Sequence, residues 1–216
     1  MIPSESPSPL NPITDCRSYF EALSDTVGKL PHADVESVVS MLMTAFERRR
    51  TVFLFGNGGS AALASHFACD LGKGTANGSG KRFRVIALTD NVPIMTAWAN
   101  DSHYEDIFAE QLINFVCPKD VAFAVSASGN SANVIKALVA ARRAGATTVG
   151  LTGFAGGKMK ALCDACVVIP TDNMQVIEDL HLSVAHALFT CVKHRISHSV
   201  THAWSGPLLV GRSAGR

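Results

Sequence analysis

The chain has 216 residues, of which 47% are hydrophobic, and it carries a formal net charge of +1 with a pI near 7.7. This length suits one domain with a full core, and the near-neutral charge predicts no nucleic-acid partner. No apolar run is long enough to span a bilayer, which predicts no membrane partner, and the Pro- and Ser-rich start lacks the core of a signal peptide. We therefore expect one cytoplasmic domain at 13–198, between a disordered tail at 1–12 and a flexible tail at 199–216.

Two amphipathic helices are expected first, over Asp15–Leu30 and Asp34–Arg48, separated by Pro31. Together they carry more apolar surface than one small sheet face should need. The residues concerned are Phe20, Leu23, Val38, Val39, Leu42 and Phe46. This excess predicts packing between subunits.

Short apolar runs then alternate with helical patterns. The predicted strands are Val52–Phe55, Phe83–Leu88, Val121–Ser126, Thr147–Thr152 and Ala165–Ile169. The predicted helices are Ala61–Leu71, Tyr104–Val116, Ala132–Ala144, Lys158–Leu162 and Met174–His198, with a mobile loop at Gly72–Lys81. Such alternation is typical of an α/β protein in which helices cover both faces of a parallel sheet.

The first predicted strand runs into a glycine-rich turn, Asn57-Gly58-Gly59-Ser60, and a helix follows. Backbone N–H groups at such a helix start can face an anion. The stretch also fits a loose dinucleotide-binding fingerprint. However, no Asp or Glu lies about twenty residues further on to hold a ribose, so we set that interpretation aside.

A second loop, Ser126-Ala127-Ser128-Gly129-Asn130-Ser131, follows the third predicted strand and precedes a helix. Three hydroxyls, a glycine and a helix N-terminus suit a phosphate monoester. An ordinary serine cap is the alternative, but one cap needs only one hydroxyl.

The candidate titratable groups lie on two helices. His66 and Asp70 are four residues apart and share a helix face. On the last helix, the polar residues Gln175, Glu178 and His186 form a ridge with Leu182, opposite the apolar stripe. His181 falls at the edge of that stripe and ranks below His186. The remaining candidate is Cys163-x-x-Cys166, which is expected to be a pair of buried, inert thiols.

With these motifs in this order and spacing, the chain from about Asp15 to His194 resembles the sugar-isomerase (SIS) domain family, and within it the phosphoheptose isomerases. The resemblance implies a three-layer αβα fold and a five-stranded parallel sheet of flavodoxin-like topology. It also implies an N-terminal helical pair that builds a homotetramer, with sites between subunits.

The resemblance further implies roles for particular residues. The phosphate loop maps onto Ser126, Ala127, Ser128 and Ser131. The sugar contacts map onto Asn57, Gly58, Gly59, Asn100 and Asp101, to which we add Ser60 and Glu178 as expected substrate contacts. The zinc-binding positions of many members match His66, Asp70, Glu178 and His186.

Three positions depart from the family pattern. Asp70 stands where a glutamate is usual, Glu178 where a glutamine is usual, and Ala127 where a threonine is usual. Two histidines and two carboxylates still suit zinc. However, Glu178 and His186 lie about 12 Å apart along an ideal helix, so one ion reaches both only if their side chains converge or the helix is distorted.

We therefore expect an aldose–ketose isomerase of carbohydrate metabolism that acts on a sugar phosphate. The resemblance favours conversion of sedoheptulose 7-phosphate to D-glycero-D-manno-heptose 7-phosphate through an enediolate. Asp70 and His186 are the expected acid/base pair, and zinc is the expected cofactor. Two alternatives stay open: an isomerase of another phosphosugar, and a non-catalytic SIS protein that binds a sugar phosphate or a protein partner such as a replication initiator.

Overall fold

The computed structural model describes residues 13–76 and 81–203, with side chains described as far as residue 198. The expected tail at 1–12 and most of the expected tail at 199–216 therefore lie outside the described residues, as does part of the expected loop at 72–81. Within the described residues, no helix is both long and apolar enough to cross a bilayer.

Five parallel strands form one sheet in the order β2-β1-β3-β4-β5. The strands are β1 (Thr51–Gly56), β2 (Arg84–Ala87), β3 (Val121–Val125), β4 (Thr147–Thr152) and β5 (Ala165–Val168). The helices are α1 (Cys16–Val27), α2 (His32–Glu47), α3 (Gly59–Cys69), α4 (Val92–Asp101), α5 (Ala109–Phe115), α6 (Ala132–Arg143) and α7 (Met174–Ala203). The predicted α/β class and flavodoxin-like strand order are confirmed.

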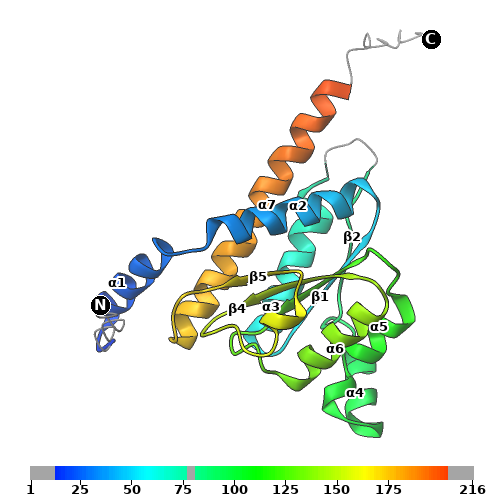
Figure 1. Cartoon of the computed structure of the whole chain (residues 1–216), viewed down its shortest axis with the longest axis horizontal. Helices are drawn as coiled ribbons and strands as arrows, with labels where there is room; N and C mark the ends of the chain where they lie inside the picture. The colour runs from blue at the N-terminus through cyan, green and yellow to red at the C-terminus, as the bar shows by residue number, and fades with distance from the viewer. Residues whose placement is uncertain (1–12, 77–80, 204–216) are drawn as a thin grey trace, which may run out of the picture.

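Helices cover both faces of this sheet (Figure 1). Along β1, Val52 and Leu54 point into the core shared with α2, α3 and α7, whereas Phe53 and Phe55 point into the core shared with α5 and α6. Because both faces are buried, β1 is a continuous apolar run rather than an alternating one. This burial is why β1 could be predicted from the sequence.

The N-terminal helices have different partners. The Val38, Val39 and Leu42 side chains of α2 are fully buried in the chain's own core. The prediction that these side chains exceed what the chain's own core needs was therefore wrong. In contrast, α1 lies beyond the end of the sheet (Figure 1), and its Phe20 side chain is 65% exposed. Within the N-terminal pair, the exposed large apolar side chains, Phe20 and Val27, thus lie on α1.

Four local elements differ from the prediction. Helix α4 was not expected, and α3 continues into a π-helical turn, Asp70–Gly74, where a loop was expected from Gly72. A 3-10 turn at Tyr104–Asp106 precedes α5, so that helix is shorter than predicted. Helix α7 runs five residues past His198.

Candidate active site

The two glycine- and serine-rich loops emerge next to each other. Strands β1 and β3 are neighbours, and Gly56 pairs with Val125 at their carboxyl ends. From β1 the chain passes to β2 on one side and later to β3 on the other, so the strand order reverses between β1 and β3. A crevice at such a switch point is where open α/β sheets bind ligands.

The first loop depends on glycine at two positions. A Cβ added at Gly56 would lie 2.6 Å from the Val125 carbonyl oxygen, so only glycine permits this close approach of the two strands. Gly58 has φ +54°, a conformation that favours glycine, and caps α3 without a side-chain hydrogen bond. The start of α3 therefore has no side-chain cap, which suits an anion there, although the Ala61 N–H already donates to the Gly58 carbonyl at 3.0 Å.

The second loop, residues 126–131, is called the serine loop here, and it closes the other side of the crevice. Ser126 Oγ lies 3.3 Å from Ser131 Oγ, and Ser131 caps α6 without a side-chain hydrogen bond to the helix. Between the two loops lies a cavity of about 150 Å³. It is lined by Asn57, Ser60, Val125, Ser126, Ala127, Ser128, Ser131, Met174 and Glu178. The structure thus brings the predicted phosphate-loop residues to one cavity with three of the predicted substrate contacts, Asn57, Ser60 and Glu178.

The connection after β4 supports the serine loop. Gly129 has φ +64°, and a Cβ added there would lie 2.2 Å from the Gly156 carbonyl oxygen. The Met159 N–H donates to the Gly129 carbonyl at 3.0 Å. This close backbone packing holds the loop in a fixed shape.

A second cavity, of about 320 Å³, lies between α3 and α7. It is lined by Gly59, Ser60, Ala62, Leu63, His66, Glu178, Asp179, His181 and Leu182. Ser60 and Glu178 line both cavities, so the first cavity, beside the serine loop (the serine-loop cavity), adjoins the second one, which His66 lines. His181 is 1% exposed, and burial lowers the pKa of its imidazole to about 4, so this histidine is neutral near pH 7.

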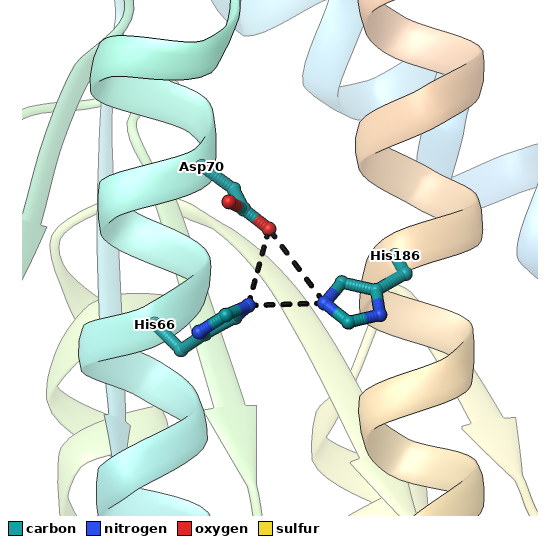
Figure 2. Close-up of side chains that lie close together, drawn as sticks. All are labelled: His66, Asp70 and His186. Atoms are coloured by element: carbon teal, nitrogen blue, oxygen red, sulfur yellow. Dashed lines mark hydrogen bonds and ion pairs between the residues drawn. The ribbon is translucent and has the colours of Figure 1, made fainter.

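Further along the same two helices, His66 and Asp70 face His186 across the gap (Figure 2). His66 Nε2 lies 3.0 Å from His186 Nε2 and 3.4 Å from Asp70 Oδ2. His186 Nε2 lies 4.0 Å from the same oxygen. Within the ranges that the structure describes, these three residues form the one group of three or more His, Cys, Asp or Glu residues whose ligand atoms lie within 4.8 Å of one another.

Glu178 does not belong to this group in a single chain. Its carboxylate lies beside Gly59, since a Cβ added to that glycine would be 3.3 Å from Glu178 Oε2. Of the four expected zinc ligands, only three therefore come together within one subunit. The reason is that α7 is a regular helix, which keeps Glu178 two turns from His186.

Two predicted sugar contacts also lie apart from the cavities. Asn100 and Asp101 occupy the exposed end of α4, where Asn100 Nδ2 donates to Asp101 Oδ1 at 2.8 Å. Neither residue lines either cavity described above.

The sequence analysis missed two neighbours of Asn57. Asn133 and Tyr104 both donate hydrogen bonds to Asn57 Oδ1, at 2.8 and 3.1 Å. A signal was present for Asn133, because an amide interrupts the apolar pattern in the first turn of α6.

This architecture defines a doubly wound α/β protein with two glycine- and serine-rich loops at the switch point and a His/Asp group beyond them. The family model described as SIS domain matches residues 17–153, so the chain belongs to the SIS domain family.

Several relatives of this chain are phosphoheptose isomerases. That of Helicobacter pylori strain P12 is 36% identical over 181 residues, which cover 84% of this chain and 93% of the relative. That of Akkermansia muciniphila is 34% identical, covering 86% and 95%. Among solved structures, phosphoheptose isomerase GmhA from Neisseria gonorrhoeae superposes with a TM-score of 0.76 at 28% identity, covering 82% of this chain and 96% of that one.

Proposed function

We propose that the protein is a cytoplasmic phosphoheptose isomerase that converts sedoheptulose 7-phosphate to D-glycero-D-manno-heptose 7-phosphate. The observation that carries this proposal is the path from the serine-loop cavity to the His66–Asp70–His186 group along α3 and α7. Ser60 and His66 are six residues apart, or about 9 Å along α3. A ligand anchored by its phosphate at one end and reacting at the other must therefore be extended, as an open-chain sugar phosphate is.

The chemistry requires a proton to move between two neighbouring carbons. A positioned base removes the proton from one carbon, and an acid returns it to the other. Asp70 and His186 carry these roles, because their side chains are 23% and 50% exposed and face a common point. Ser126, Ser128 and Ser131 hold the phosphate at the far end and fix the reacting carbons in place.

The three-residue group fits zinc. Ligand atoms in tetrahedral zinc sites lie about 3.3 Å from one another, and the three separations here are 3.0, 3.4 and 4.0 Å. His66, Asp70 and His186 would hold the ion and leave a fourth position for a group from outside the set. Because an atom bound to zinc cannot also transfer a proton, Asp70 and His186 would serve as ligands before the sugar arrives and as acid and base once it displaces them. A bound zinc would polarise the sugar carbonyl and stabilise negative charge on its oxygen.

A non-catalytic SIS protein is the alternative. Binding of a sugar phosphate requires the loops at the switch point, but it does not require a carboxylate and two imidazoles on facing helices. These groups favour an enzyme over a sensor or a protein-binding module. A ketose that binds but is never isomerised would favour the alternative.

Ser128→Ala is expected to weaken binding of sedoheptulose 7-phosphate by about 10- to 100-fold, because a hydrogen bond to a charged group contributes about 1.5–3 kcal/mol. Calorimetric titration measures this change. Ser37→Ala, at an exposed position on α2, is the matched control and should bind as the wild type does. Equal affinities of the Ser128 variant and the wild type would remove the serine loop from the phosphate site.

A homotetramer is the proposed assembly. Light scattering after gel filtration should give about four times the 22.9-kDa chain mass. Phe20→Asp should shift the mass toward smaller species, because it places a charge on the exposed apolar surface of α1. Phe115→Asp is the control, since Phe115 is similarly exposed on α5. A monomer mass for the wild type at micromolar concentration would contradict the proposal.

A further inference from the structure

Asn133 is a buried amide beside the proposed sugar-phosphate site. It is 2% exposed and lies in the first turn of α6, directly after the serine loop. Its Oδ1 accepts the Val134 backbone N–H at 2.9 Å. Because a backbone N–H can only donate, this bond requires the oxygen of the Asn133 amide on that side and the Nδ2 group on the other.

The orientation of Asn133 determines that of Asn57. Asn133 Nδ2 donates to Asn57 Oδ1 at 2.8 Å, and Asn57 Nδ2 donates back to Asn133 Oδ1 at 2.9 Å. The two amides thus form a reciprocal pair, and turning either one over would place donor against donor and acceptor against acceptor. A single backbone N–H at Val134 therefore fixes both side chains.

Tyr104 also helps to fix the orientation of the Asn57 side chain. Its hydroxyl donates to Asn57 Oδ1 at 3.1 Å, so that oxygen already accepts two hydrogen bonds. The turn that carries Tyr104 is tied to α6, because the buried Asp106 carboxylate forms an ion pair with Lys136. Helix α6 thus holds both partners of Asn57.

We propose that Asn133 is a positioning residue that makes Asn57 a donor-only contact for the ligand. An Asn side chain has two N–H donors and two acceptor lone pairs. Asn57 uses both lone pairs and one N–H inside the network, so one N–H remains to face the cavity that it lines. The site therefore selects an acceptor oxygen at this point of the sugar phosphate. This inference rests on the proposed function.

Steady-state kinetics with sedoheptulose 7-phosphate tests the proposal, and inhibition by inorganic phosphate reports separately on the serine loop. Asn133→Ala should raise KM by about tenfold or more, because it releases Asn57 from its fixed orientation. The inhibition constant for phosphate should stay within about twofold of the wild-type value. Asn114→Ala, at an exposed position on α5, is the matched control and should leave both constants unchanged.

Tyr104→Phe keeps the test decisive if Asn133→Ala fails to fold. Tyr104 is 58% exposed, and loss of its hydroxyl should raise KM by about fivefold with no change in the phosphate constant. Wild-type KM in both variants would overturn the proposal. A parallel rise of KM and the phosphate constant would also overturn it, because Asn133 would then act by holding the serine loop.

Calorimetric affinities for sedoheptulose 7-phosphate and inorganic phosphate separate this inference from the proposed function. If the wild type binds the sugar phosphate without converting it, the isomerase proposal fails. The role of Asn133 is then supported if Asn133→Ala binds the sugar phosphate more weakly than the wild type but binds inorganic phosphate equally well, and it is overturned if both affinities match the wild type. A wild type that binds neither compound would overturn the positioning role as well.

Discussion

Asp70→Asn is expected to lower kcat by about 10²- to 10⁴-fold, the range over which positioned acid or base groups contribute. Asparagine has the same shape as aspartate, but its amide cannot take up the proton that isomerisation removes from carbon. KM should change little, because the phosphate is held by the serine loop at the other end of the ligand. The measurement is steady-state kinetics with sedoheptulose 7-phosphate, read as separate kcat and KM effects.

Two further variants serve as controls for Asp70→Asn. Asp70→Glu keeps the carboxylate and should retain measurable turnover. Asp172→Asn makes the same chemical change at an exposed position before α7 and should leave both constants at wild-type values. Wild-type kcat in Asp70→Asn would show that proton transfer uses another group.

His186→Ala is expected to lower kcat over a similar range and also to lower the zinc content of the purified protein. Removing even an outer-shell partner of a metal ligand typically costs 10- to 100-fold in affinity, so losing one of three ligand side chains should cost at least that much. Zinc is measured by atomic absorption after dialysis against metal-free buffer, beside kcat for the same preparation.

The matched control for that measurement is His194→Ala, which removes another exposed histidine from α7 outside the three-residue group. It should keep both turnover and zinc. Equal zinc contents in His186→Ala and the wild type would remove His186 from the metal site. Wild-type turnover of His186→Ala would remove it from the acid/base pair.

The fold was predictable because burial leaves a clear pattern in this sequence. Strands β1 and β3 are buried on both faces, so their sequences are continuous apolar runs that differ from the periodic patterns of the helices. Helix α4 left a weaker pattern, because none of its residues is fully buried and its apolar face, Met95, Trp98 and Ala99, is only partly covered by the core. Pro93 lies in its first turn, where proline suits a helix start, yet prolines elsewhere in a sequence more often end helices.

The site was predictable only where its geometry is local. His66 and Asp70 share a face because they are four residues apart on one helix. His186 joins them from α7 through tertiary packing, so its place beside them came from family resemblance. The rise along a helix did predict that Glu178 and His186 would be separated, as the structure shows. The pairing of Asn57 with Asn133 joins residues 76 positions apart and could not be read from local spacing.

The most direct test of the central claim follows the purified protein with sedoheptulose 7-phosphate by NMR. We predict the appearance of aldose anomeric signals from a heptose 7-phosphate, with solvent deuterium entering at the carbon that receives the returned proton when the reaction is run in D₂O. The Asp70→Asn protein should produce both signals about 10²- to 10⁴-fold more slowly. A ketose that remains unchanged after hours with wild-type, zinc-supplemented protein, although calorimetry detects its binding, would contradict the isomerase and favour a non-catalytic sugar-phosphate-binding protein.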